Sequence, residues 1–239
     1  MTAVTGTASL STDELYARAA AGLPCWVSDG TGRRIELPMS RWFGRADTAE
    51  AERSADHAMV AQCVGSTVDL GCGPGRFTAA LTDRGTAALG VNSSAVAVRM
   101  TIARGAMAVQ RDMFAPLPGT GAWSRVLLAD GNIGIGGEPV RVLRRAGELL
   151  RPGGLAVVEI DRPGTGVTHA DLRFQTENAV GEWFRWARVG VDTIADVAAG
   201  AGMTLSRWPR SRDASSRRSP QPETHAAAAQ PGFSPVTLR

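Results

Sequence analysis

The sequence predicts a doubly wound α/β domain built around a mostly parallel sheet. From residue 66 onward, short apolar segments alternate with longer amphipathic ones, which is the order of strands and helices in such a domain. The apolar segments at residues 126–128 and 156–158 are continuous, as expected for strands that helices cover on both faces. Parallel strands joined through helices also imply right-handed crossovers.

The predicted elements follow one another without an internal repeat. Strands are expected at residues 67–70, 87–91, 106–110, 124–129 and 155–160, and a further strand is expected to start at 203–208. Helices are expected at residues 77–84, 95–104, 139–150 and 191–201. We divide the chain into an N-terminal lid at residues 1–64, the α/β domain at 65–208 and a tail at 209–239.

The lid is expected to contain helices and a hairpin. Ser11 and Glu14 have the spacing of a capping box, which opens a short helix. Residues 25–38 surround an Asp-Gly pair that is typical of a hairpin turn, and a polar helix follows at about 47–63. The lid either covers the main sheet or contributes one wall of a substrate pocket through Arg41, Trp42 and Phe43.

Composition excludes several classes of protein. With 44% apolar and 21% charged residues, the chain has ordinary globular usage. No apolar run approaches the ~18 residues that span a bilayer, and the first residues lack the pattern of a secretory signal. The three cysteines (Cys25, Cys63 and Cys72) form no CxxC pair. We therefore expect a reducing, cytoplasmic compartment, no membrane partner and no metal site.

The net charge of +3 belongs to the C-terminal segment. All 26 basic residues are arginine, and six of them lie from Arg207 onward beside two acids. The preceding residues therefore carry 20 basic and 21 acidic groups. A nucleic-acid substrate requires a clustered cationic face, so this balance argues against one.

The strongest motif is VDLGCGPGRF at residues 68–77. A buried strand there runs into a glycine-rich turn and then a helix, which lets a ligand approach bare main chain. The dinucleotide fingerprint has a third glycine where this chain has Arg76. The pattern is D-x-G-x-G-x-G instead, which disfavours a nicotinamide oxidoreductase.

This string resembles motif I of class I S-adenosylmethionine-dependent methyltransferases. The resemblance extends over residues 66–160 and includes Asp112 and an LLRPGG turn at residues 149–154. It implies a Rossmann-like methyltransferase fold and S-adenosyl-L-methionine as the cofactor. The loop under the methionine and ribose of the cofactor would consist of Gly71, Cys72, Gly73 and Gly75. Asp69 would support this loop and help hold the methionine ammonium, or its carboxylate would be satisfied by loop N–H groups alone.

The resemblance also assigns the ends of the second and third strands. The family ends its second strand in an acid that accepts from both ribose hydroxyls, whereas this chain has Asn92. Asparagine offers one carbonyl oxygen and no charge, and Asn92 could instead cap the helix that opens near Ser94. Asp112 would accept from the adenine amino group beside an apolar wall of Met113 or Phe114, or would be a surface partner of an arginine.

The segment ADGNIGIGG at residues 129–137 lies where the transferable methyl group meets its acceptor in this fold. Asp130 is a candidate general base, acceptor anchor and cofactor contact, and Asn132 a candidate orienting residue. The glycines would leave room for the acceptor. The alternative is a flexible connection to the next helix. His169, further along, is a weaker candidate base.

Aromatic and basic residues gather at 182–188. Trp183 would supply apolar area for a substrate, while Arg185 and Arg188 would hold an anionic group. The alternative is that Trp183 and Trp186 pack a helix on the sheet.

The tail departs from the family. Residues 209–239 are rich in Arg, Ser, Pro and Ala, so we expect them to be disordered and to leave the C-terminal sheet edge incomplete. A basic tail that binds an acidic partner is the alternative.

The predicted function is methyl transfer to a small molecule by in-line displacement. A non-catalytic cofactor-binding or interaction module is the alternative, suggested by Asn92 and the atypical tail.

Overall fold

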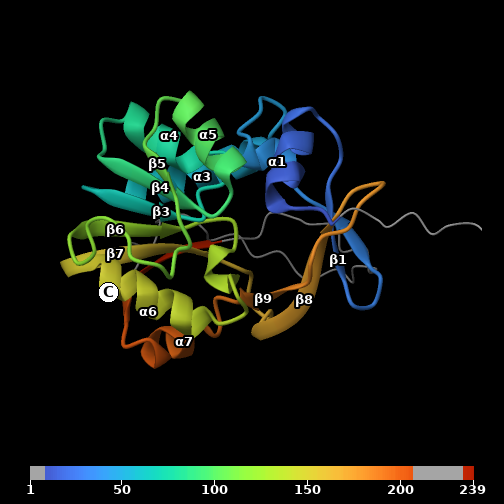
Figure 1. The fold of residues 1–239 in the computed structure, drawn as a ribbon. Coiled ribbons are helices and arrows are strands. Elements are labelled where there is room, and N and C mark those ends of the chain that lie inside the picture. The colour runs from blue at the N-terminus through green and yellow to red at the C-terminus, as the bar shows by residue number, and fades with distance from the viewer. Residues whose placement is uncertain (1–8, 207–233) are drawn as a thin grey trace, which may run out of the picture.

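The structure, a computed structural model, describes residues 9–206 and 234–239. Figure 1 shows a large sheet between two layers of helices, with a small sheet beside it at one end. In the described ranges, no helix has the length and apolar character needed to cross a bilayer.

The large sheet has seven strands in the order β10-β11-β7-β6-β3-β4-β5. Five neighbouring strands pair in parallel: β3 (Thr67–Leu70), β4 (Ala88–Asn92), β5 (Ala108–Gln110), β6 (Trp123–Leu128) and β7 (Leu150–Ile160). All five therefore end at the same edge of the sheet, where ligands bind in doubly wound folds. The predicted α/β class with a mostly parallel sheet is confirmed.

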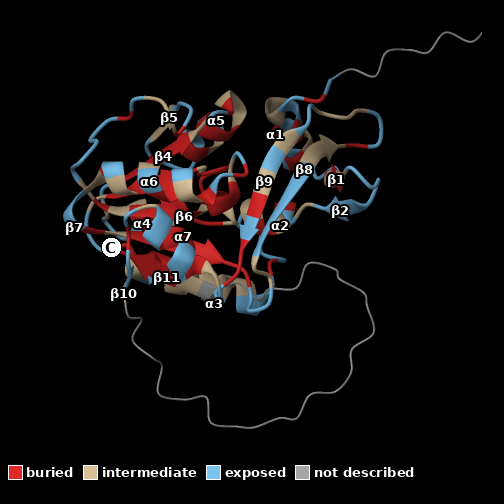
Figure 2. Ribbon diagram, turned by 90° about the horizontal axis from the view of Figure 1, so that it is seen from below, coloured by how far each residue is buried: buried red, intermediate tan, exposed pale blue. Residues whose placement is uncertain are grey.

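Helices cover the two faces of the large sheet (Figure 1). One face carries α3 (Glu50–Gln62), α4 (Arg76–Asp83) and α5 (Ala95–Ala103), and the other carries α6 (Pro139–Leu149) and α7 (Ile194–Gly200). Strand β6 has an apolar residue toward each layer, because Val126 and Leu128 pack with α6 and α7 while Leu127 packs with α3 and α4. This burial on both faces explains the continuous apolar run, and Figure 2 shows the same strands buried.

The small sheet is antiparallel and joins distant parts of the chain. Its order is β2 (Arg34–Glu36), β1 (Trp26–Asp29), β8 (Val167–Gln175) and β9 (Phe184–Val189). The predicted hairpin is thus present as β1 and β2, but β1 also pairs with β8. Helices α1 (Thr12–Ala20) and α2 (Met39–Trp42) complete this part of the molecule.

The suggestion that Trp183 and Trp186 lie on a helix is wrong. Trp186 belongs to strand β9, where it faces Ala170 across the ladder with β8. In β9, Ala187 and Val189 are buried, while Arg188 between them is exposed. A period of two is the pattern of a strand.

The expectation of an incomplete sheet edge is also wrong. Strand β11 (Ser234–Leu238) lies antiparallel between β7 and β10 (Leu205–Ser206), and Leu238 is fully buried. Pairing on both sides, together with burial of Val236 and Leu238 in the core with α6 and α7, stabilises this short strand despite Pro235. The disorder expected for residues 209–233 lies outside the described residues.

Candidate functional site

The glycine-rich turn joins β3 to α4 at the ligand-binding edge of the large sheet. Gly71, Gly73 and Gly75 have φ of 78°, 53° and 86°, a region that favours glycine. A Cβ on Gly71 would lie 2.6 Å from Nδ2 of Asn132, and one on Gly75 would lie 2.8 Å from Cα of Thr101. The first and third glycines therefore permit close packing of the turn on its neighbours.

Gly73 faces the N-terminal helix α1. A Cβ on Gly73 would have the hydroxyl of Tyr16 as its neighbour, at 3.4 Å. The Tyr16 side chain is buried, which raises its pKa well above the usual value, and its hydroxyl hydrogen-bonds the Asn92 side chain. The main chain of Gly73 is thus the part of the turn that a ligand between the turn and α1 would meet.

Cys72, inside the turn, is fully packed. Its Sγ lies 3.8 Å from Oγ1 of Thr101, and burial raises the pKa of the thiol well above its usual value. Such a thiol is a poor nucleophile, and Cys72 is placed to fill space under the turn.

Asp69 is buried at the end of β3. Its carboxylate accepts a hydrogen bond of 2.7 Å from the Thr78 hydroxyl on α4. Burial raises the pKa of Asp69 to about 7, and the charge of Asp130 adds to this effect while the hydrogen bond from Thr78 opposes it. Asp69 can therefore be neutral or charged near neutral pH, and a cation placed beside it would favour the charged form.

At the end of β4, Asn92 is already hydrogen-bonded within the protein. Its Oδ1 accepts from the main-chain N–H of Ser94 at 2.9 Å, which makes a turn leading into α5. Ser94 in turn caps α5 by accepting from Ala97 N–H at 3.1 Å. Asn92 therefore forms the turn that leads into α5, whereas the helix cap, which the alternative assigned to Asn92, is Ser94.

Helix α1 also reaches the start of α5 through Asp13. Its Oδ1 accepts from the Ser94 hydroxyl at 2.5 Å and from Val96 N–H at 3.2 Å. The hydrogen bond from Ser94, then that from Val96, lowers the pKa of Asp13, so its carboxylate is charged at neutral pH. An acid at the first turn of a helix interacts favourably with the helix dipole.

Asp112 and Met113 follow β5 and point to different surroundings. Asp112 is exposed, and its carboxylate accepts from Phe114 N–H at 2.9 Å. Met113 is buried in the core under α6, so it is not exposed to form the apolar wall expected of it. Phe114 is half-buried, and the guanidinium of Arg141 stacks 4.1 Å from its ring centre.

Asp130 belongs to an ion cluster in which Arg41 and Glu159 are buried and the other members are half-buried; its five residues are Arg41, Asp56, Arg76, Asp130 and Glu159. Nη2 of Arg76 donates to both carboxylate oxygens of Asp130 at 2.7 Å, and Arg76 also pairs with Asp56. Arg41 donates to Glu159 at 2.8 Å and to Asp56 at 3.2 Å. The N–H of Asp130, at a left-handed φ of 51°, donates to Glu159.

The ion cluster limits what Asp130 can do. Because its carboxylate is held by Arg76, it is a weaker candidate for a free general base than the sequence suggested. Burial raises the pKa of Glu159, and the charge of Asp130 adds to this, while Arg41 opposes it. Sequence reasoning did not assign Asp56, Arg76 or Glu159 to this site. For Glu159 a signal was available, because it is an acid inside the apolar segment 155–160.

Asn132 holds the glycine-rich turn in place. Its Nδ2 donates to the carbonyl oxygens of Leu70 at 2.9 Å and Gly71 at 3.0 Å. The amide is therefore committed to main chain at the end of β3. Its position supports the turn and does not leave its N–H groups free for an acceptor.

The glycines after β6 bring β9 close and leave no room beside Gly134. A Cβ on Gly134 would overlap the carbonyl oxygen of Ala187, at 1.9 Å, and one on Gly137 would lie 3.0 Å from Cβ of Arg185. The Trp186 ring lies 3.9 Å from the Cβ position of Gly131. The expectation that these glycines open space for an acceptor is wrong at Gly134 and Gly137, where strand β9 fills it.

His169 is not brought to the glycine-rich turn. It is exposed on β8 and lines an open groove of about 600 Å³ with Glu138 at the start of α6 and Asp196 on α7. This groove shares no residue with the turn or the ion cluster. A catalytic role for His169 in the same site is therefore not supported.

The predicted substrate residues Trp183, Arg185 and Arg188 have different surroundings. Arg188 donates to both carboxylate oxygens of Asp161, at 2.5 and 3.2 Å, so its guanidinium is already paired. Trp183 is 48% exposed and stacks 4.6 Å from the guanidinium of Arg173. Arg185 is exposed beside Gly137.

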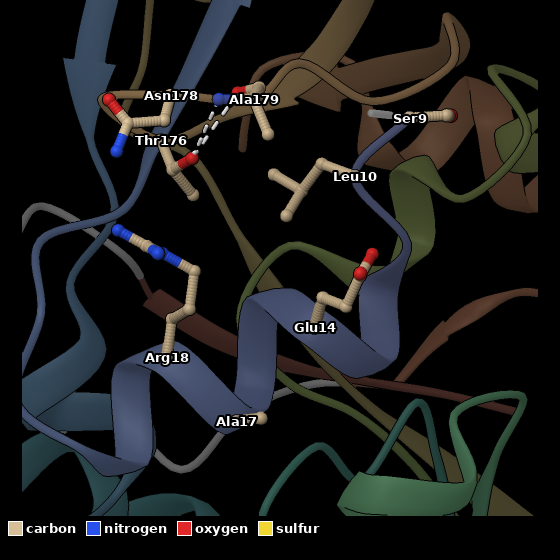
Figure 3. A pocket seen from close by; sticks show the side chains of 8 residues that line it. All are labelled: Ser9, Leu10, Glu14, Ala17, Arg18, Thr176, Asn178 and Ala179. Carbon is tan, nitrogen blue, oxygen red and sulfur yellow. Dashed lines mark hydrogen bonds between the residues drawn. The ribbon is translucent and has the colours of Figure 1, made fainter. Parts of the chain in front are cut away.

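A cavity of about 280 Å³ lies between α1 and the connection from β8 to β9 (Figure 3). Glu14 and Arg18 line it from α1, and Thr176 and Asn178 line it from the connection. Asp13 and Tyr16 are not among its lining residues. Helix α1 thus has one face toward this cavity and another toward the glycine-rich turn.

Several solved structures similar to this chain are methyltransferases. One from Bacteroides fragilis, in complex with S-adenosyl-L-homocysteine, matches with a TM-score of 0.71 at 18% identity and covers 98% of each chain. The 1,6-didemethyltoxoflavin N1-methyltransferase of Burkholderia thailandensis, with its substrate and S-adenosylhomocysteine bound, matches with a TM-score of 0.53 at 18% identity over 97% of this chain and 92% of that one. A sugar N-methyltransferase of Streptoalloteichus matches with a TM-score of 0.53 at 17% identity over 100% and 96%.

Sequence comparison matches a smaller part of the chain than structure comparison does. Residues 54–159 match the model of a family described as methionine biosynthesis protein MetW. No curated protein matches the sequence. The predicted resemblance is confirmed at the level of the fold, which is that of S-adenosylmethionine-dependent methyltransferases.

Proposed function

We propose that this protein transfers a methyl group from S-adenosyl-L-methionine to a small-molecule acceptor. The observation that supports this most strongly is the glycine-rich turn after β3. There Gly73 offers bare main chain, and buried Asp69 lies just before the turn. Exposed Asp112 follows β5 at the same edge of the sheet.

The residues present fit the parts of this cofactor. Asp69, with a pKa of about 7, would become fully charged beside the methionine ammonium. The main chain of Gly73 would lie against the methionine and ribose, and Asp112 would accept from the adenine amino group beside Phe114. Each of these groups matches the charge or hydrogen-bonding capacity of the part that it would hold.

When bound, the cofactor supplies a methyl group on a positively charged sulfur, which is already electrophilic. What remains for the protein is to align the acceptor in line with that methyl group and to exclude water. Asn132 would contribute to this alignment as a positioning residue, because it fixes the glycine-rich turn through hydrogen bonds to Leu70 and Gly71. The ion cluster around Asp130 holds the neighbouring turn, and Trp186 forms an aromatic wall beside Gly131.

Two observations favour a small molecule as the acceptor. The residues before Arg207 carry no excess of positive charge, which a nucleic-acid substrate would require. The neighbours from Burkholderia and Streptoalloteichus are named for methyl transfer to a small heterocycle and to a sugar. Of the two features that suggested a non-catalytic module, Asn92 and the atypical tail, the tail ends in β11, which pairs with β7.

Isothermal titration calorimetry with S-adenosylhomocysteine tests the cofactor assignment, with NADH as the competing ligand. We expect S-adenosylhomocysteine to bind and NADH not to bind. Gly73→Val should abolish binding, because a branched side chain at φ of 53° would be strained and would occupy the ligand's space. Binding of NADH alone, or undiminished binding by the variant, would overturn the assignment.

Release of S-adenosylhomocysteine in the presence of small-metabolite fractions then tests catalysis. Mass spectrometry should find an acceptor heavier by one methyl group in a fraction that supports release. Release that depends on added nucleic acid or protein, and on no small-molecule fraction, would contradict the acceptor class.

A further inference from the structure

We propose that Asp13, on the N-terminal helix, supplies the carboxylate that binds the ribose hydroxyls of the cofactor. Asp13 would take the role of the acid that methyltransferases of this fold have at the end of the second parallel strand, where this chain has Asn92. The inference rests on the proposed cofactor but assigns a residue from outside the parallel sheet. It follows from how Asn92, Ser94 and Asp13 are placed relative to one another.

Asn92 is poorly suited to the ribose by its own contacts. Its single acceptor, Oδ1, already receives the N–H of Ser94 at 2.9 Å. Its side chain also hydrogen-bonds the hydroxyl of buried Tyr16. An amide with its oxygen engaged has little capacity left to accept from two hydroxyl groups.

Asp13 brings a charged acceptor to the same place. Oδ1 of Asp13 accepts from the Ser94 hydroxyl at 2.5 Å and from Val96 N–H at 3.2 Å. The carboxylate therefore lies beside Ser94, which follows Asn92 by two residues where the chain leaves β4. The carboxylate also receives a hydrogen bond from the main-chain N–H of Ala95. Two carboxylate oxygens offer about four acceptor sites, so Asp13 keeps capacity for a hydroxyl donor, and a charged acceptor binds such a donor more strongly than an amide.

Helix α1 is held against the site at two successive points. Asp13 fixes its first turn to the start of α5, and Tyr16, one turn later, lies over Gly73. The other face of α1, with Glu14 and Arg18, lines the separate cavity of Figure 3. The helix thus places Asp13 at the start of α5, just after β4, and Tyr16 at the turn after β3.

Calorimetric binding of S-adenosylhomocysteine to four forms of the full chain tests the proposal: wild type, Asp13→Asn, Glu14→Gln, and the double variant Asp13→Asn with Asn92→Asp. Asp13→Asn keeps one oxygen for Ser94 but removes the charge and replaces the other acceptor oxygen with an N–H donor. Glu14→Gln removes the same charge from the same turn of α1 but on the face toward the other cavity, so it is the matched control.

We expect Asp13→Asn to raise the Kd about tenfold, and Glu14→Gln to change it less than twofold. The double variant, which returns the acid to β4, should recover affinity to within about threefold of wild type. Wild type should also prefer S-adenosylhomocysteine over its 2′-deoxyribose analogue, and Asp13→Asn should lose most of that preference. Loss of a helix cap alone would weaken both ligands equally, and thermal unfolding of each variant checks that α1 remains folded.

Unchanged binding by Asp13→Asn would overturn the proposal. Tighter binding would overturn it as well, because it would mean that Asp13 holds α1 over the ribose site and competes with the ligand. Equal losses for both ligands without rescue in the double variant would assign Asp13 to helix capping and not to the ribose. Absence of binding by the wild type would instead contradict the proposed function.

Discussion

Replacing Asp69 with Asn should change how the stability of the protein depends on pH. In the folded protein burial raises the pKa of Asp69 to about 7, whereas the reference value is 3.8. Between these values the acid is protonated when folded and ionised when unfolded. Ionisation therefore favours the unfolded state, and this contribution lowers stability as pH rises, up to the folded pKa.

The size of the effect follows from the two pKa values. Between pH 3.8 and about 7, each rise of one pH unit lowers the free energy of unfolding by about 1.4 kcal/mol, and above pH 7 this dependence ends. Between pH 5 and pH 8 the wild type should thus lose roughly 2–3 kcal/mol through Asp69 alone. Asn has the same shape, can still accept from Thr78 and does not titrate.

Urea unfolding of both proteins, measured without ligand at several pH values from 5 to 8, isolates this contribution. Other titrating groups affect both proteins alike and cancel in the difference. We expect Asp69→Asn to gain roughly 2–3 kcal/mol relative to wild type across this range. A difference that stays constant within about 0.5 kcal/mol would refute the burial argument, because it would mean that Asp69 titrates at the same pH in both states.

Three further changes test the packing around the site. Gly75→Ala should lower the free energy of unfolding by more than about 2 kcal/mol, because the added Cβ would meet the main chain of Thr101. Gly85→Ala is the control, since Gly85 also has a positive φ but faces open space, and it should lower the free energy of unfolding by only about 1 kcal/mol. Equal losses in urea unfolding would contradict the steric argument. Asn132→Ala leaves two carbonyl groups without their donor and should weaken S-adenosylhomocysteine binding about tenfold, and an unchanged Kd by calorimetry would remove its positioning role. Deleting residues 234–239 removes buried side chains and exposes the edges of β7 and β10. We therefore expect either that thermal unfolding is no longer cooperative or that the protein self-associates in size-exclusion chromatography. A monomer with the original Tm would show that β11 contributes nothing to stability.

The sequence by itself determined the parallel sheet and the glycine-rich turn. Both depend on local patterns: apolar runs buried on two faces, and glycines where φ is positive. Such signals lie within ten residues of chain. For the same reason the sequence places Asp69 near the end of a strand and Gly73 in the turn that follows it.

Tertiary structure alone decided which distant residues meet at the ends of the strands. Strand β11 pairs with β7, which ends more than seventy residues earlier, and Glu159 meets Arg41 from the lid. These pairings depend on the closure of long loops, and no local pattern encodes the partner. Asp13 illustrates the point: in the sequence it is one of two acids in the first turn of a helix, yet folding places it against Ser94, eighty-one positions away, because docking of α1 on α5 selects that face of the helix.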